Sequence, residues 1–285
     1  MGEILASTQL CGIVLHPAGH TRSPAMHNAA FAALGLDARY LAFDVAPERL
    51  GEAIAGARAL GIRQLAVSIP HKESVIEYLD ELDPTARAIG AVNTVTLRED
   101  RLVGTNTDWL GAVRALERET TLEGKDAVVL GAGGTARAVA YGLLERGARV
   151  TVLNRTEARA AQLTAELGAA RGAADGLGEA GGLERLAALP CQVLVNTTSV
   201  GLGSDESPVE AEALPREAVV LDAVYDPERT RLLEDAQGRG AKTVGGKWML
   251  VHQAAEQLRL WSGRDAPLDV MAEAFDAAGR ARSGR

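Results

Sequence analysis

The feature that most constrains the fold of this chain is an alternation of short apolar runs with longer amphipathic runs. The apolar runs lie at residues 10–15, 39–45, 64–67, 127–130, 150–153, 193–195 and 219–221. Stretches with apolar residues at helical spacing separate several of them, for example at 47–60 and 135–146. Strands that alternate with helices are typical of βαβ units, in which helices cover a mainly parallel sheet. The sequence therefore predicts an α/β protein.

Length and rhythm together predict two domains. The chain has 285 residues, and one domain usually takes roughly 150. Because the strand and helix rhythm restarts after residue 106, we expect one domain at 1–106 and a second at 107–246. From Lys247 onward only two helical patterns remain. A terminal helix pair often packs back on an earlier domain, so we expect residues 247–285 to complete the first one.

The sequence also predicts local structure at several places. Ser23 and Pro24 indicate a helix start, with a hydroxyl cap and a proline in the first turn. The runs 95–97 and 102–103 indicate a hairpin, and 73–79 has a helical pattern. The Ala- and Gly-rich stretch 168–182 is interpreted as loops around one short element.

Composition narrows the range of partners. Lys and Arg number 30 against 38 Asp and Glu, a net charge of −8, which does not fit a nucleic-acid or anionic-membrane binder. No apolar run approaches the roughly 18 residues of a membrane helix. Neither Cys11 and Cys191 nor the histidines show the spacing of a disulfide framework or a metal site. We expect a cytoplasmic monomer or homodimer that acts on a small molecule, without metal, nucleic acid or membrane.

A glycine-rich turn joins the apolar run at 127–130 to the helical pattern after it. Its residues match the dinucleotide fingerprint G-x-G-x-x-G/A: Gly131, Ala132, Gly133, Gly134, Thr135 and Ala136. In that motif the glycines let the backbone approach a pyrophosphate, and the helix start offers free N–H groups. The turn favours a nucleotide cofactor, with an ordinary β–α turn as the alternative.

The end of the next strand indicates which dinucleotide binds. NAD-binding proteins typically carry an acidic residue there, about 20 positions beyond the first glycine. Here Asn154, Arg155 and Thr156 occupy the strand end, and Arg159 follows. Two guanidinium groups can bind a 2′-phosphate through paired hydrogen bonds. The pattern favours NADP over NAD, and a solvated Arg155 at a helix start is the alternative.

Several polar residues in the first half are candidates for a site. Lys72 lies at the start of the helical pattern 73–79, where the positive end of a helix disfavours a cation. A residue that breaks a local rule can mark a functional site, and an ordinary surface lysine is the alternative. Asp108 is a good helix cap without any function. Small polar residues at strand ends fit either turns or ligand contacts: Thr21, Ser23, Ser68 and Asn93.

Taken in order, these motifs resemble the shikimate/quinate dehydrogenase family over nearly the whole chain. The matching runs are 19–28 (GHTRSPAMHN), 67–72 (VSIPHK), 90–94 (GAVNT), 106–108 (NTD), 131–135 (GAGGT), 154–156 (NRT), 195–201 (VNTTSVG), Tyr225 and 249–254 (MLVHQA). The resemblance implies an N-terminal α/β substrate domain and a Rossmann-like NADP-binding domain, with C-terminal helices on the first domain. It also implies NADP-dependent interconversion of shikimate and 3-dehydroshikimate, a step of chorismate and aromatic amino-acid biosynthesis.

The resemblance further implies roles for individual residues. Lys72 and Asp108 fall on the catalytic pair, and which of them carries the proton stays open. Three residues fall on positions that hold the substrate carboxylate: Thr21, Ser23 and Tyr225. Three fall on positions that contact ring hydroxyls or line that pocket: Ser68, Asn93 and Gln253. The cofactor positions are Gly131, Ala132, Gly133, Gly134, Thr135, Asn154, Arg155, Thr156, Arg159, Thr197, Ser199, Ala223 and Gly246.

The chain also departs from the family pattern. Thr21 stands where the family has a serine, Ala66 replaces an asparagine, and His71 replaces an apolar residue. Lys247 and Trp248 place a cation and a large ring near the expected nicotinamide end. These changes bear on substrate range more than on reaction type. A quinate/shikimate paralogue with broader substrate or NAD use therefore remains an alternative.

A non-catalytic NADP-binding sensor is an alternative of a different class, since a fold does not fix a function. We would expect such a protein to have lost Lys72 or Asp108. Both residues are present.

Overall fold

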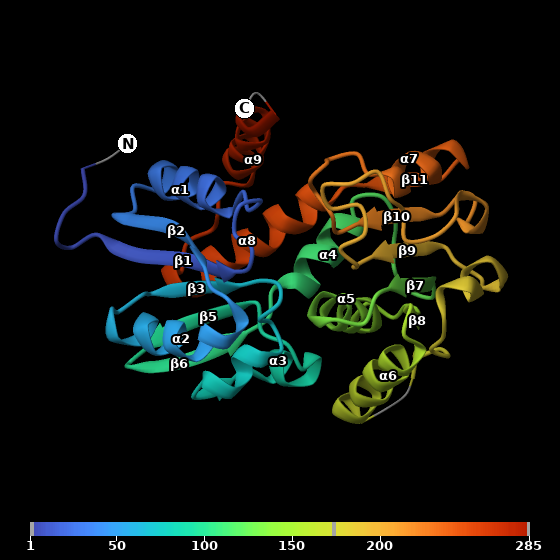
Figure 1. The fold of residues 1–285 in the computed structure, drawn as a ribbon, viewed down its shortest axis with the longest axis horizontal. Helices are drawn as coiled ribbons and strands as arrows, with labels where there is room; N and C mark the ends of the chain where they lie inside the picture. The colour runs from blue at the N-terminus through green and yellow to red at the C-terminus, as the bar shows by residue number, and fades with distance from the viewer. Residues whose placement is uncertain (1–2, 173–174, 284–285) are drawn as a thin grey trace. The chain divides into compact units, whose positions relative to one another are not determined.

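The chain forms two units, which the computed structural model describes for residues 3–172 and 175–283 (Figure 1). Of these residues, unit 1 takes those up to Arg87, Ala91–Thr107 and those from Val251 onward. Unit 2 takes Ala88–Gly90 and Asp108–Leu250. The C-terminal part of the chain thus belongs to the same unit as the N-terminal part.

Unit 1 is built on a six-stranded sheet, here called sheet A, with the order β2-β1-β3-β5-β6-β4. Its strands are β1 (Gln9–Leu15), β2 (Ala38–Asp44), β3 (Gln64–Val67), β4 (Glu81–Leu82), β5 (Thr94–Arg98) and β6 (Arg101–Thr105). Its helical segments are α1 (Ser23–Leu34), η1 (Pro47–Arg49), α2 (Leu50–Ala59), η2 (Ser74–Tyr78) and α3 (Pro84–Ile89). Strands β2, β1 and β3 are parallel, whereas β5 is antiparallel to both β3 and β6.

Unit 2 is built on a fully parallel five-stranded sheet, here called sheet B, with the order β11-β10-β9-β7-β8. Its strands are β7 (Asp126–Leu130), β8 (Arg149–Leu153), β9 (Val193–Asn196), β10 (Val219–Asp222) and β11 (Lys242–Val244). Its helical segments are α4 (Asp108–Leu116), α5 (Gly134–Glu145), α6 (Glu157–Arg171), η3 (Leu183–Ala188), η4 (Ala211–Ala213) and α7 (Arg231–Gly238).

The two faces of sheet B are buried by different residues of each strand. Val129 belongs to the core that packs against α4 and α5, and its neighbour Val128 belongs to the core that packs against α7. Alternating side chains of a strand point to opposite faces, and parallel sheets are usually covered on both. The predicted α/β class with a Rossmann-like parallel sheet is confirmed.

Two helices end the chain, α8 (Gly246–Ser262) and α9 (Leu268–Ser283). Within unit 1, α9 packs against α1. The Arg22 guanidinium lies 4.3 Å from the centre of the Phe275 ring, and both side chains are buried. Helix α9 and the part of α8 from Val251 onward therefore belong to the first unit, as predicted, whereas Gly246–Leu250 at the start of α8 belong to unit 2.

Three local predictions are wrong. Residues 168–171 are helical, because α6 continues to Arg171 and ends at Gly172 in the left-handed conformation. Residues 74–78 form a short 3₁₀ helix, so Lys72 does not precede an α-helix. Ser23 is not a cap, because it is the first residue of α1, and the cap position belongs to Arg22.

Candidate active site

One edge of sheet A carries most of the residues proposed for substrate. Strands β1, β3 and β6 end at this edge, and β5 begins there, because β5 runs opposite to β3 and β6. Thr21 and Ser23 follow β1, Ser68 follows β3, and Asn93 precedes β5. The topology thus gathers residues that are distant in sequence.

Asn93 is the polar centre of this edge. Its side chain is 2% exposed, and its Nδ2 donates to Thr107 Oγ1 at 2.9 Å and to Gln253 Oε1 at 3.2 Å. Its Oδ1 accepts from the Thr107 backbone N–H at 2.8 Å, and its backbone carbonyl accepts from Val67 N at 2.8 Å. Asn93 therefore joins the end of β3, the segment after β6 and helix α8.

The loop 68–72 is held by its own backbone and by a buried histidine. His71 N donates to Ser68 O at 2.8 Å, and Val92 N donates to Lys72 O at 2.8 Å. The His71 ring is fully buried, and its Nε2 lies 2.7 Å from Val45 O, to which it donates. His71 thus fixes this loop to the end of β2, which explains a polar residue at an apolar position of the family.

The segment after β1 forms a tight turn into α1. The backbone N–H of Ser23 donates to Thr21 Oγ1 at 3.3 Å. Ser23 is buried and Thr21 is half-buried. The threonine hydroxyl therefore has a local role in shaping the turn in addition to the role that the resemblance implies.

Asp108 is the first residue of α4 and is 5% exposed. It directly follows Thr107, whose backbone and hydroxyl are bound to Asn93. Asn93 in turn follows Val92, which is bound to the Lys72 carbonyl. Val92 and Asn93 thus hold the backbone at Lys72 and at Thr107, the residue before Asp108.

In unit 2, the glycine turn follows strand β7, which lies between β9 and β8 in sheet B. Gly131 has a φ of 113°, and a Cβ there would lie 2.5 Å from Thr197 Oγ1. That hydroxyl donates to Leu130 O at 2.6 Å, so it cannot move away freely. Gly133 caps α5, and no atom lies within 4 Å of its ideal Cβ position. The turn has an open helix N-terminus of the kind that binds phosphate.

The residues after β8 present two arginines. Arg155 and Arg159 are exposed, and neither guanidinium forms a hydrogen bond or ion pair with the part of the chain that the structure describes. Asn154 Nδ2 donates to Thr156 O at 2.9 Å and shapes the turn before α6. Both cations are therefore available for an anionic ligand.

The segments after β9 and β10 contain the remaining cofactor candidates. Thr197 is half-buried and Ser199 is exposed. A Cβ on Gly246 would lie 2.6 Å from Ala223 O, so only glycine fits at the start of α8. Tyr225 is half-buried two residues beyond Ala223. Among the residues that the structure describes, no three His, Cys, Asp or Glu side chains are grouped as metal ligands.

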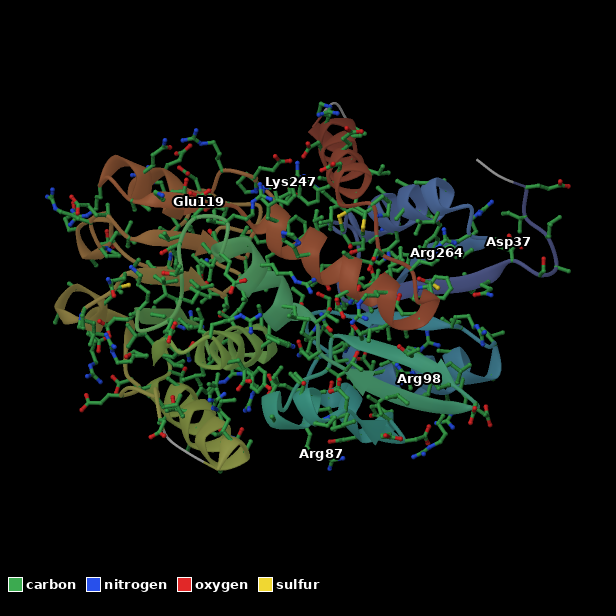
Figure 2. All side chains as sticks on the ribbon, turned by 180° about the vertical axis from the view of Figure 1, so that it is seen from behind. Asp37, Arg87, Arg98, Glu119, Lys247 and Arg264 are labelled. Carbon is green, nitrogen blue, oxygen red and sulfur yellow. The ribbon has the colours of Figure 1, made fainter. Side chains whose placement is uncertain are left out.

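The two unusual residues at the start of α8 belong partly to packing. Lys247 lies in the first turn of this helix (Figure 2), with its Nζ 5.4 Å from the centre of the Trp248 ring. The Arg118 guanidinium lies 3.9 Å from the same ring, and Trp248 packs against the core beside α4 and α5. Cation–π stacking explains a tryptophan here without any ligand.

These features fit a dinucleotide with a 2′-phosphate. The glycine turn leaves room for a pyrophosphate, and the two arginines supply cations where an NAD-binding protein has an acid. Sequence reasoning missed Asp222, a fully buried carboxyl group that ends β10. The sequence feature that could have identified Asp222 is its position, since it is an acidic residue at the end of an apolar strand.

Three models of known protein families match parts of this chain. The model of the shikimate dehydrogenase substrate-binding domain matches residues 13–95. The shikimate/quinate 5-dehydrogenase model matches 114–183, and the shikimate 5′-dehydrogenase C-terminal domain matches 246–274. No helix in the described ranges is both long and apolar enough to cross a membrane.

Several known proteins are similar over almost their full length. A shikimate dehydrogenase (NADP(+)) from Thermococcus kodakarensis is 52% identical over 90% of this chain and 92% of its own. A crystal structure of a shikimate dehydrogenase in complex with NADP+ is 39% identical, covers 97% of both chains and has a TM-score of 0.91. The Thermus thermophilus shikimate 5-dehydrogenase in complex with NADP(H) and shikimate is 40% identical, with a TM-score of 0.86 over 95% of this chain and 99% of its own.

The same fold also occurs in a solved enzyme that is named for a different substrate. A quinate dehydrogenase from Corynebacterium glutamicum in complex with NAD is 30% identical, with a TM-score of 0.85 over 95% of this chain and 99% of its own. Its identity is lower than that of the shikimate enzymes above. From its sequence motifs and these similarities, the chain belongs to the shikimate dehydrogenase family.

Proposed function

We propose that this chain catalyses the NADP-dependent, reversible reduction of 3-dehydroshikimate to shikimate, an oxidoreductase step of chorismate and aromatic amino-acid biosynthesis. The observation that carries the proposal is the 52% identity, over 90% of this chain, with a shikimate dehydrogenase (NADP(+)). The two exposed, unpaired arginines after β8 support the choice of cofactor.

The chemistry requires one hydride and one proton. NADPH supplies the hydride when it is bound, and the ketone oxygen must gain a proton to become a hydroxyl. Lys72 and Asp108 are the proposed residues for this proton. Lys72 ends the loop 68–72, and its carbonyl accepts from Val92 N, next to Asn93; Asp108 follows Thr107, which Asn93 binds. The pair acts as a unit, without assignment of the proton to one member.

The substrate roles follow the edge of sheet A and the segment after β10. Thr21, Ser23 and Tyr225 are proposed to hold the substrate carboxylate, and Ser68, Asn93 and Gln253 to contact ring hydroxyls. Gln253 Oε1 already accepts from Asn93, so the amide orientation is fixed and its N–H donors face away from Asn93.

The cofactor roles lie in unit 2. Gly131, Ala132, Gly133, Gly134 and Thr135 are proposed to contact the pyrophosphate. Four residues after β8 are proposed to contact the adenosine ribose and its 2′-phosphate: Asn154, Arg155, Thr156 and Arg159. Four residues are proposed for the rest of the cofactor: Thr197, Ser199, Ala223 and Gly246.

Absorbance at the nicotinamide band tests the proposal directly. Purified protein is offered shikimate or quinate, each with NADP or with NAD. Reduction with shikimate and NADP, far above the other three combinations, is the expected result. A preference for quinate or NAD would instead assign the chain to the paralogous activity, for which Thr21 and Ala66 leave room. Binding of NADP without turnover in any combination would favour a sensor.

We also propose a cytoplasmic location and a monomer or homodimer as the working form. Cell fractionation tests the first statement, and sedimentation equilibrium tests the second. Larger assemblies, or recovery with membranes, would contradict them.

A further inference from the structure

Asp222, at the end of β10, is a fully buried carboxyl group. Among the described residues no cation forms an ion pair with it. Burial raises its pKa to about 6, and three hydrogen-bond donors counteract that rise. All three hydrogen-bond partners donate, which is the arrangement that the ionised carboxylate requires. A buried charge without a counter-ion is costly, and hydrogen bonds must offset that cost.

Three segments of unit 2 donate hydrogen bonds to this carboxylate. Its Oδ1 accepts from Asn196 Nδ2 at 2.9 Å and from Val224 N at 3.0 Å. Its Oδ2 accepts from Thr230 Oγ1 at 2.6 Å. A carboxylate only accepts, so it suits three donors, whereas an asparagine would direct N–H groups of its own at some of them.

Asn196 extends the network into the segment after β9. It is the register partner of Asp222 on the adjacent strand. Its Oδ1 accepts from Thr198 N at 3.0 Å and from Thr198 Oγ1 at 2.8 Å. The same hydroxyl accepts from Val200 N at 3.2 Å. Through Asn196, Asp222 is therefore linked to hydrogen bonds at the backbone N–H groups of Thr198 and Val200. These residues flank Ser199, and Asn196 and Thr198 flank Thr197.

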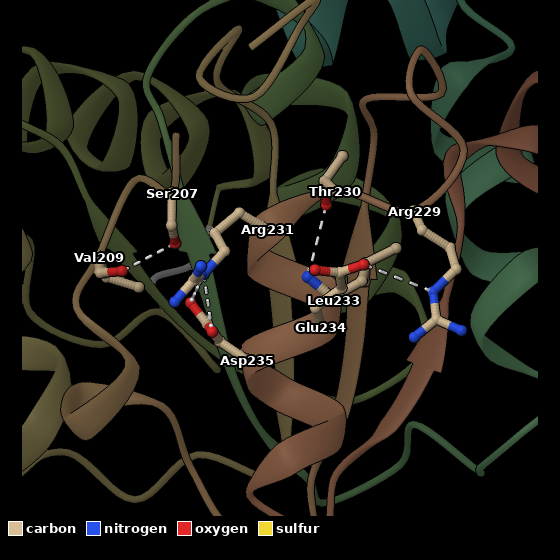
Figure 3. Close-up of polar contacts among 8 residues, drawn as sticks. All are labelled: Ser207, Val209, Arg229, Thr230, Arg231, Leu233, Glu234 and Asp235. Carbon is tan, nitrogen blue, oxygen red and sulfur yellow. Dashed lines mark hydrogen bonds and ion pairs between the residues drawn. The ribbon is translucent and has the colours of Figure 1, made fainter. Parts of the chain in front are cut away.

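Thr230 extends the network in the other direction, into α7. Its hydroxyl accepts from Leu233 N at 3.4 Å and so caps this helix (Figure 3). The Thr230 branch concerns helix stability, because no residue of α7 is among the proposed cofactor contacts. The network thus has two cofactor branches, through Asn196 and Val224, and one branch that is purely structural.

We propose that Asp222 is a positioning residue that holds the segments 197–200 and 223–225 in the conformation that binds the cofactor. The inference rests on the proposed NADP site, because Thr197, Ser199 and Ala223 lie in these segments. Orienting the segments before binding lowers the entropy that the cofactor must offset. Asp222 itself acts through Asn196 and Val224.

The test compares Asp222→Asn with the wild-type protein. NADPH fluorescence gives the dissociation constant, and amide hydrogen exchange without cofactor reports on Val200 and Val224. We expect the Kd to rise about tenfold, the size typical of losing one hydrogen bond to a charged group. Exchange at both amides should accelerate, while kcat at saturating NADP stays within about twofold.

Three further variants separate positioning from general stability. Thr198→Val keeps Asp222 and removes the hydroxyl that donates to Asn196 and accepts from Val200 N. The Kd should still rise, and this variant carries the test if Asp222→Asn does not fold. Thr230→Val should lower thermal stability with little change in Kd. Asp235→Asn removes a carboxylate that pairs with Arg231 on α7 (Figure 3) and should change neither the thermal stability nor the Kd.

Two results would overturn the proposal. Normal NADPH binding and normal exchange in both Asp222→Asn and Thr198→Val would contradict the positioning role alone. An equal rise in Kd in Thr230→Val would reduce the network to general stability. Absence of NADPH binding by the wild type would instead contradict the proposed cofactor, and the exchange rates at Val200 and Val224 would still report on the segments.

Discussion

At the scale of single residues, the proposed proton chemistry makes Lys72 the first residue to test. Replacing it by alanine removes one member of the proposed acid/base pair and leaves the backbone bond from Val92 N to the Lys72 carbonyl possible. We expect kcat to fall on the order of 10²-fold or more, while NADP affinity and melting temperature stay near the wild-type values. Steady-state kinetics and a thermal melt measure this. Lys242→Ala, which removes an exposed lysine beside Glu119, is the control, and near-normal turnover of Lys72→Ala would remove it from the mechanism.

The proposed choice of NADP over NAD assigns the 2′-phosphate to Arg155 and Arg159. We expect Arg155→Ala to weaken NADP about 10- to 100-fold, through loss of charge-assisted hydrogen bonds to the 2′-phosphate. NAD affinity should change less than about twofold. Titration of both cofactors by fluorescence measures the difference. The control is Arg149→Ala, at the other end of β8 and paired with Asp126, which should change the affinity for neither cofactor. If Arg155→Ala weakened both cofactors equally, Arg155 would not bind the phosphate.

His27 should make stability depend on pH. It is fully buried against Tyr40, with ring centres 4.1 Å apart, and burial lowers its pKa to about 3. Because the unfolded chain binds a proton near pH 6.5 and the folded chain does not, this contribution to stability is present above pH 6.5. It is lost as the pH falls toward 3, by up to about 1.4 kcal/mol per pH unit.

Denaturant unfolding at several pH values tests this contribution. His27→Phe keeps a ring against Tyr40 but cannot titrate, so its unfolding free energy should fall less steeply than the wild type between pH 6.5 and 4. Parallel curves for the two proteins would assign the acid sensitivity to other groups.

At the scale of elements, two glycines of one turn have separable roles. Gly131→Ala forces a left-handed φ on alanine and drives its Cβ against Thr197 Oγ1, so we expect the unfolding free energy to fall by about 2 to 4 kcal/mol. Gly133→Ala has open space and an allowed φ of −103°, so the fold should persist. NADP binding should still weaken, because the methyl group occupies the approach of the pyrophosphate. Chemical denaturation and NADPH titration separate the effects, and equal stability of the two variants would contradict this division.

The same turn shows which elements a sequence can predict. The strand, turn and helix around Gly131 were predictable because apolar period, glycine spacing and helix start agree locally. The 3₁₀ helix Ser74–Tyr78 was not, because long-range bonds set both ends. Lys72 O accepts from Val92 N, and Asp80 N donates to Leu102 O. These contacts leave a five-residue helix where the local pattern favours a longer one.

The end of α6 was mispredicted for a different reason. Several glycines follow Leu167, and each could end the helix. The structure ends it at Gly172, which has a φ of 68°, and Arg171 in the last turn pairs with Glu145 on α5. Which glycine takes the left-handed conformation therefore depends on packing between α5 and α6, information that the local sequence lacks.

The candidate site was predictable only through its motifs. Ser68, Asn93 and Gln253 were singled out, and the structure gathers Asn93 and Gln253 within hydrogen-bonding distance. Asp222 was missed because its meaning depends on the register that pairs it with Asn196. Strand register in a parallel sheet is set by the whole domain, so the network between these residues becomes visible only in three dimensions.

At the scale of the whole molecule, the C-terminal helix supports a site segment near the N-terminus. Arg22 lies between Thr21 and Ser23 in sequence, and its guanidinium packs 4.3 Å from the centre of the Phe275 ring on α9. Phe275→Ala removes a fully buried ring and should lower the unfolding free energy by about 3 to 5 kcal/mol. It also removes the ring against which the Arg22 guanidinium packs, so the KM for shikimate should rise several-fold.

The Kd for NADPH should stay unchanged in Phe275→Ala, because the proposed cofactor residues belong to the other unit. Leu50→Ala is the matched control. It removes a buried side chain from the core beside α2 in the same unit, to which the segment 21–23 does not belong, and we expect a similar cost in stability. The test is to measure the unfolding free energy, the KM for shikimate and the Kd for NADPH on both variants. A larger KM in Phe275→Ala alone means that the last helix orders the carboxylate-binding turn, whereas equal changes in the two variants would mean that general loss of stability in this unit is sufficient.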